Sequence, residues 1–142
     1  MDITFPDRKT TVLPKTEYFS DFLVNLDAHP DNMQLVKNIN EKAVIRSIRN
    51  LLFTNKYERL FQPDIGCEIN KILFEPLTPA SVSALKTVIE NTIQRYEPRA
   101  GLFLEVIVTP YIEQNLLVVT IKFFISNSQQ PVSFTVQLSR VR

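Results

Sequence analysis

The chain has 142 residues, enough for one domain that buries about two thirds of the surface its unfolded form exposes. Hydrophobic residues make up 44% and charged residues 22%, which excludes the intrinsically disordered class. The formal net charge is +1, so bulk charge implies no nucleic-acid partner. The N-terminus lacks a signal segment, and no apolar run approaches the roughly 18 residues that span a bilayer. We therefore expect a protein made in the cytoplasm, with no membrane partner.

The residues needed for common catalytic sites are scarce. The single cysteine, Cys67, allows no internal disulfide, and with the single histidine, His29, it supplies too few ligands for zinc catalysis. Two glycines in the whole chain are too few for a phosphate-binding loop. We expect His29 to be a solvated loop residue and Cys67 a buried small hydrophobe, and we expect no cofactor or metal.

The first 40 residues give weak patterns. Residues 1–16 contain Pro6 and Pro14 and little periodicity, and we expect an extended arm. Residues 18–26 carry apolar side chains at helical spacing, which predicts a short helical turn. Residues 33–39 are expected to be extended, and Asn40 is a suitable helix cap.

The helical part is expected to span residues 41–99. An apolar stripe predicts an amphipathic helix from Glu41 to about Phe53, with Arg46 and Arg49 on a solvated basic face. Pro63 and Gly66 indicate a tight extended loop, and residues 69–74 a short helical turn.

A sharply bounded helix follows. The Thr78 hydroxyl can cap its first amides, and Pro79 suits the first helical position because its missing N–H costs nothing there. Pro98 disfavours helical angles at Glu97, which should be the turning point. The stripe expected to face the core comprises Val82, Leu85, Ile89, Ile93 and Tyr96.

After Gly101 the apolar period changes from 3.6 to 2. Residues 102–109, 116–126 and 132–138 are rich in β-branched and aromatic residues, with turns expected at 110–115 and 127–131. A three-stranded antiparallel β-meander over 102–139, packed against the preceding helices, makes one α+β domain over 1–142.

The tripeptide Glu97-Pro98-Arg99 has two interpretations. It can be a helix stop, in which Arg99 offsets the helix dipole and Glu97 pairs locally. It can instead present a carboxylate and a guanidinium in fixed geometry for a partner chain. The residues alone leave both open.

Several ordered motifs make the sequence similar to a known family. They are Ser47-Ile-Arg-Asn-Leu-Leu52, Glu58-Arg59, Phe61-Gln-Pro-Asp-Ile-Gly-Cys67, Leu73-Phe-Glu-Pro76 and Tyr96-Glu-Pro-Arg99. In this order they closely resemble the baseplate wedge family of contractile phage tails, whose members are called sheath initiators and also lysozyme-like. A related type VI secretion component shares the Glu-Pro-Arg signature. The resemblance covers roughly residues 40–140, with Tyr57 where the family usually has glycine and Leu60 where it often has proline.

The resemblance implies a non-enzymatic structural subunit of the virion, present in six copies per tail baseplate and assembled in the host cytoplasm. The expected partners are other wedge proteins, the tail sheath protein and the tail tube. Glu97, Pro98 and Arg99 would dock to the wedge core bundle.

The resemblance also favours a second contact, at the last predicted strand. An edge strand at a chain end can be extended by a strand of another protein, here the sheath. The residues expected there are Val132, Phe134, Val136 and Leu138. From the residues alone, an ordinary edge strand would be favoured.

Two other classes of function stay open. Paired carboxylates such as Glu68, Glu75 and Glu97 could serve a peptidoglycan-cleaving, lysozyme-like tail enzyme. A generic intracellular adaptor is the other alternative.

Overall fold

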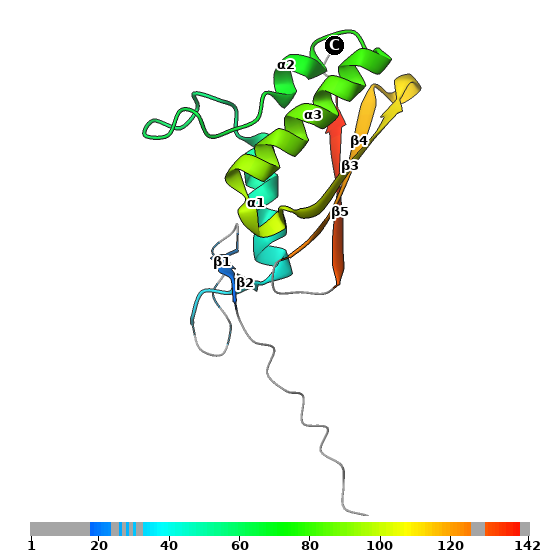
Figure 1. Ribbon diagram of the computed structural model, residues 1–142. Coiled ribbons are helices and arrows are strands. Elements are labelled where there is room, and N and C mark those ends of the chain that lie inside the picture. The colour runs from blue at the N-terminus through cyan, green and yellow to red at the C-terminus, as the bar shows by residue number, and fades with distance from the viewer. Residues whose placement is uncertain are drawn as a thin grey trace, which may run out of the picture.

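The computed structural model describes residues 18–23, 26, 28, 30, 33–125 and 130–139. The predicted arm at 1–16, His29 and most of the turn at 127–131 lie outside these residues. Figure 1 shows helices α1 and α3 lying over one face of a three-stranded sheet, with the small β1–β2 hairpin near one end of α1. The predicted α+β class is confirmed.

The sheet is an antiparallel meander in the order β3-β4-β5. Its strands are β3 (Leu102–Tyr111), β4 (Leu116–Phe124) and β5 (Pro131–Ser139), and the short 3-10 helix η2 (Ile112–Gln114) joins the first two. Strand β3 is two residues longer than predicted, and β4 two residues shorter. A register shift between Leu102 and Glu105 interrupts the pairing at the start of β3.

The core lies between this sheet and the helices. Alternate residues of β4 are buried, in register with Val106 of β3 and Val136 of β5. Helix α1 (Glu41–Phe53) adds Val44, Ile48 and Leu52 to the same core. Burial of these branched side chains is the main contribution to the stability of the domain.

Helix α3 (Pro79–Tyr96) begins and ends where the sequence predicts. The Thr78 hydroxyl accepts from the Ser81 N–H at 3.2 Å, and the Ser81 hydroxyl accepts from the Thr78 N–H at 2.9 Å, which completes a capping box. Leu85, Ile89 and Ile93 are fully buried. Val82 and Tyr96, at the two ends of the predicted stripe, are only partly buried. The short helix α2 (Ile69–Leu73) precedes it, and the 3-10 turn η1 (Pro98–Ala100) follows it.

Two predictions near the N-terminus are wrong. The residues predicted to form a helical turn contain strand β1 (Ser20–Phe22), which pairs with β2 (Lys37–Ile39). Asn40 does occupy the N-cap position of α1 as predicted, but its side chain does not cap the helix. Its Oδ1 accepts instead from the backbone N–H groups of Tyr18 and Phe19, at 2.9 and 3.2 Å. Contacts across about 20 residues thus hold this segment extended, overriding its local spacing.

Candidate functional site

The turn after α3 carries an internal ion pair. Glu97 is 3% exposed, and its carboxylate accepts two bonds from Arg99, from Nε at 2.5 Å and from Nη2 at 2.7 Å. The Ser47 hydroxyl of α1 donates to the same carboxylate. Paired and hydrogen-bonded charges of this kind fix geometry because either group alone would be costly to bury.

The Arg99 guanidinium connects this turn to the β1 segment. Its central carbon lies 5.3 Å from the ring centroid of Phe19. The hydrogen bonds that Arg99 donates to Glu97 raise the pKa of Arg99, so it stays charged although partly buried. Three segments remote in sequence therefore meet here.

The structure corrects the picture of a corner that presents both charges to a partner. The Glu97 carboxylate is enclosed and bonded within the chain, so a partner cannot reach it. Arg99 remains 35% exposed in its side chain, and Pro98 is exposed. Docking at this corner stays a prediction, and the guanidinium is its only accessible charge.

A groove of about 280 Å³ lies beside Arg99. Its walls come from β1, α1, the end of α3 and the loop that follows α1. Its lining residues are Ser20, Asp21, Ala43, Ser47, Asn50, Leu51, Arg59, Ile65, Tyr96 and Arg99. A shallow, mostly polar groove with two arginines suits a polar segment of another protein better than a small apolar ligand.

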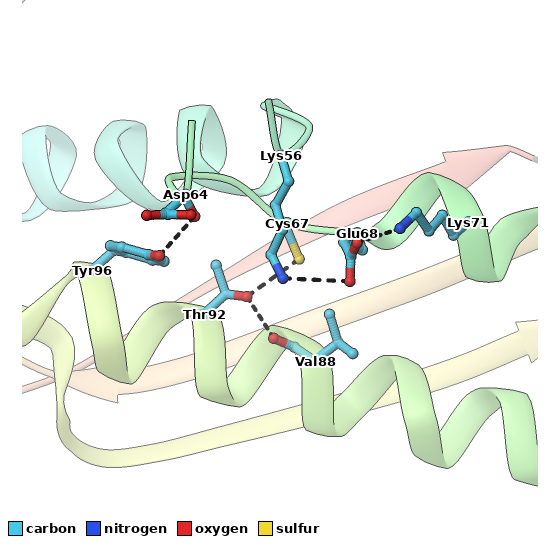
Figure 2. A network of polar contacts seen from close by, with 8 residues as sticks. All are labelled: Lys56, Asp64, Cys67, Glu68, Lys71, Val88, Thr92 and Tyr96. Atoms are coloured by element: carbon cyan, nitrogen blue, oxygen red, sulfur yellow. Dashed lines mark hydrogen bonds and ion pairs between the residues drawn. The ribbon is translucent and has the colours of Figure 1, made fainter. Parts of the chain in front are cut away.

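The loop that follows α1 is tied down at its base. The Cys67 N–H donates to the Thr54 carbonyl at 2.8 Å, and the Tyr96 hydroxyl donates to the Asp64 carbonyl at 2.7 Å. Figure 2 shows Tyr96 and Thr92, on the same face of α3, meeting the returning strand of this loop. The tight extended loop predicted from Pro63 and Gly66 is confirmed, with Gly66 at φ +145°.

Cys67 is 1% exposed, as predicted for a buried small hydrophobe. Burial raises the pKa of its thiol, which keeps it protonated near neutral pH, and the Thr92 hydroxyl lies 3.6 Å from its sulfur. It therefore has the character of a packing residue.

The two arginines predicted to lie on a solvated face of α1 have different surroundings. Arg49 is exposed as expected. Arg46 is 20% exposed in its side chain, and its Nε lies 3.7 Å from a carboxylate oxygen of Asp21. The expectation of a fully solvated basic face is therefore wrong for Arg46.

Strand β5 pairs with β4 along one edge. Over the described residues, no strand pairs with its other edge. The side chains of Val132, Phe134, Val136 and Leu138 turn toward the core, and the Phe134 ring contacts Phe123 edge to face at 6.3 Å. Any added strand would therefore meet the β5 backbone, while these four side chains hold β5 to the domain.

Other kinds of site find little support in the part of the chain that the structure describes. No group of three or more His, Cys, Asp or Glu residues there could hold a metal ion. None of the helices seen there is both long and apolar enough to cross a membrane.

The sequence analysis missed the partner of Glu97. Ser47 lies three residues after Val44 and four before Leu51, on the buried stripe of α1. A hydroxyl at such a position needs an internal partner. That spacing was the available signal, but it could not identify a carboxylate 50 residues away.

Comparison with known proteins identifies the family of the chain. A family model described as baseplate wedge protein gp25 matches residues 39–130. The baseplate wedge protein gp25 of Enterobacteria phage T4 is 32% identical over 111 residues, which cover 75% of this chain and 83% of that protein.

Two solved structures share the fold. A candidate tail lysozyme from Geobacter sulfurreducens superposes with a TM-score of 0.68 at 21% identity, over 75% of this chain and 96% of that one. A chain of the anti-feeding prophage baseplate gives a TM-score of 0.59 at 22% identity, over 87% of each chain. At such identities the likeness concerns the fold alone. The family match covers more than half of the chain, and the chain therefore belongs to the gp25 family of baseplate wedge proteins, structural components of phage tail baseplates.

Proposed function

We propose that this wedge protein docks to the core bundle of its baseplate wedge through the groove beside Arg99. We propose further that it offers the free edge of β5 as the strand on which the tail sheath starts to assemble. The observation that carries the docking role is that Glu97, itself inaccessible, holds the Arg99 guanidinium at the wall of a groove.

The groove supports docking because its geometry is preformed. Bidentate pairing and the Phe19 ring both restrict Arg99, so binding a partner costs little side-chain entropy. Its Nη1 is the guanidinium nitrogen that the bonds to Glu97 do not use. An acidic side chain or a carbonyl of a partner can accept from it.

Blocking the groove tests the docking role. Arg99→Ala would leave the buried Glu97 carboxylate short of partners and could lower stability for that reason alone. Asn50 is exposed and lines the groove without touching the ion pair, so Asn50→Trp should fill it at little cost to the fold. We expect wedge assembly, reconstituted with the other wedge proteins of the same particle, to fall at least about tenfold.

The matched control is Arg49→Trp, one residue earlier on α1 and exposed but outside the groove lining. Its assembly should equal that of the unmodified chain. Normal assembly of a folded Asn50→Trp variant would refute docking through this groove.

The edge of β5 supports sheath initiation. A strand of nine residues has enough main-chain groups for pairing, and its inward side chains fix its register on the core. Its exposed outward side chains are uncharged, Ser133, Thr135 and Gln137 among them. The lysines or prolines that often block edge strands are missing from the middle of β5.

Proline substitution tests this edge. Consecutive N–H groups in a strand point to opposite edges, so of Phe134 and Thr135 one bonds to β4 and the other faces the free edge. Phe134→Pro also loses the ring contact with Phe123 and should unfold the domain. Thr135→Pro keeps the Phe134 ring, so unchanged circular dichroism and melting temperature of this variant identify Thr135 as the residue whose N–H faces the free edge. We expect that folded variant to prevent sheath polymerisation on the baseplate.

Ser133→Pro repeats the test at the equivalent position, because its N–H points the same way as that of Thr135. Growth of normal sheath on baseplates carrying either folded proline variant would exclude initiation at this edge. By the same proposal, six copies of this chain are present in each baseplate. The sheath protein and the tail tube are their neighbours.

The alternative is a peptidoglycan-cleaving tail enzyme, which the name of the Geobacter sulfurreducens protein suggests for that protein. A glycosidase needs a general acid whose pKa is raised. Glu97 is enclosed by its bonds to Arg99 and Ser47, and the nearby lysines lower the pKa of Glu68. These contacts favour the structural role. Release of reducing sugar from peptidoglycan by the purified chain, abolished in Glu97→Gln, would favour the enzyme instead.

A further inference from the structure

The loop between α1 and α2 presents an apolar tip to solvent. Figure 1 shows this segment extending away from the helices and the sheet. Leu60 is 93% exposed and Phe61 is 96% exposed, the highest values among the large hydrophobic residues that the structure describes. Neither side chain contributes to the core of the domain.

The tip stands on a well-bonded loop. The Tyr57 N–H donates to the Pro63 carbonyl at 2.8 Å across the loop, and the Ile65 N–H donates to the Gln62 carbonyl at 3.2 Å. The Asn55 N–H donates to the Glu58 carboxylate at 2.8 Å. With the contacts of Cys67 and Tyr96 at the base, these bonds span the loop from end to end.

At the base of the loop the chain passes so close to Gly66 that no side chain fits there. A Cβ at Gly66 would lie 2.6 Å from the Thr54 carbonyl oxygen. The two ends of the loop therefore approach each other as closely as a glycine allows. Tyr57 accepts a left-handed conformation, φ +69°, in forming the turn. The loop is therefore a preorganised projection and not a loose connection.

Two charged residues, Glu58 and Arg59, precede the tip, and they differ in their contacts. Glu58 turns its carboxylate back to the Asn55 N–H. Arg59 is exposed beside Leu60, and among the described residues no ion pair engages it. The tip is thus apolar with one adjacent positive charge.

We propose that the loop tip formed by Leu60 and Phe61 inserts into an apolar, acid-rimmed pocket of a neighbouring baseplate protein. This contact goes beyond the groove and the β5 edge. Large apolar side chains on such a projection bury their surface only in a partner, and the bonded backbone of the loop lowers the ordering cost of binding. The positive charge of Arg59 favours acidic residues at the rim of the partner's pocket, by charge complementarity.

Substitution of the tip tests the contact in the full chain. Leu60→Ser combined with Phe61→Ser should leave the melting temperature within about 2 °C, because neither side chain is buried. Its incorporation into wedges reconstituted with the other baseplate proteins should fall at least about tenfold. Ile112→Ser is the matched control, an apolar residue 72% exposed at the β3–β4 turn, and should assemble normally.

A photoreactive phenylalanine analogue at position 61 identifies the partner in the assembled baseplate. We expect it to cross-link to one other baseplate protein, within an apolar segment that has Asp or Glu nearby. Arg59 also lines the groove, so its test uses an Asn50→Trp chain in which the groove is already blocked. In that chain Arg59→Ala should lower the yield of the cross-link at position 61 several-fold and reduce its dependence on salt.

Four outcomes would overturn the proposal. They are a fall in melting temperature of 5 °C or more on substitution of the tip, unimpaired incorporation of the folded double variant, an equal loss in Ile112→Ser, and cross-links confined to a second copy of this chain. Vesicle co-sedimentation that depends on Phe61, with no protein cross-link, would likewise replace the proposal with a membrane contact. A groove-blocked Asn50→Trp chain that still cross-links at position 61 would separate this contact from docking beside Arg99.

Discussion

The corner at Glu97 and the loop tip at Phe61 reverse the usual distribution of side chains. At the corner a carboxylate is 3% exposed, whereas at the tip a phenyl ring is 96% exposed. Most proteins bury the ring and expose the carboxylate. The charged group nevertheless contributes to the fold, since its bonds to Ser47 and Arg99, together with the contact of Arg99 with Phe19, join α1, the end of α3 and the chain just before β1.

The difference separates residues that maintain the fold from residues that are available to partners. The Glu97 pair contributes by leaving no buried charge unsatisfied, and its loss should be felt in the isolated chain. The tip residues make no contact with the core of the domain. Their substitution should therefore lower assembly without lowering the stability of the isolated chain. Variants of the two regions should therefore differ in where their effects appear.

Gly66→Ala should have the largest effect on stability. The new Cβ would meet the Thr54 carbonyl, and φ +145° is strained for any residue with a side chain. We expect a loss of about 4 kcal/mol in the free energy of unfolding, measured by urea titration. Opening of the loop base should also speed the reaction of the Cys67 thiol with a thiol reagent at pH 8. An unchanged urea midpoint would show that the base of the loop adjusts to the new side chain. That result would contradict a preorganised loop tip.

Glu97→Ala should have the next largest effect. It leaves the Arg99 guanidinium partly buried without its carboxylate, which should cost about 3 kcal/mol. The melting temperature of a domain this size should then fall by about 10 °C. Ser47→Ala, which removes one bond to the same carboxylate, should cost only about 1 kcal/mol. Equal losses in the two variants would mean that the Arg99 pair adds nothing beyond that hydroxyl.

Tyr57→Gly should have the smallest effect, and in the stabilising direction. Tyr57 has φ +69° and a side chain 77% exposed, so glycine relieves backbone strain at little loss of packing. We expect the free energy of unfolding, measured by thermal denaturation, to rise by about 0.5 to 1 kcal/mol. Asn115→Gly is the control, because asparagine already tolerates its φ of +50°. A loss of stability in Tyr57→Gly would show that the tyrosine ring supports the loop.

The same backbone angle gives a physical reason for the glycine that the family resemblance leads us to expect at position 57. The family resemblance places glycine where this chain has Tyr57, and the turn requires a conformation that glycine adopts without strain. The chain keeps the turn with a tyrosine, through the bond from its N–H to the Pro63 carbonyl.

Segments governed by nearby residues were predicted well. The start of α3 depends on Thr78 and Pro79, and its end on Pro98, all within a few residues of the boundaries. The strands of the meander follow from their alternating apolar residues. The β1 segment was mispredicted because the Asn40 side chain, about 20 residues away, binds its backbone.

The sequence by itself determined the α+β class, the two boundaries of α3, the closed loop at Gly66 and, through its ordered motifs, the family. Each depends on local backbone preferences or on apolar periodicity, which short stretches of sequence contain. The tertiary structure alone decided that Glu97 turns inward, that Arg99 faces a groove, and that Phe61 stands free of the core. Which side chain is enclosed depends on how α1, α3 and the loop pack together, and no short stretch of sequence contains that packing.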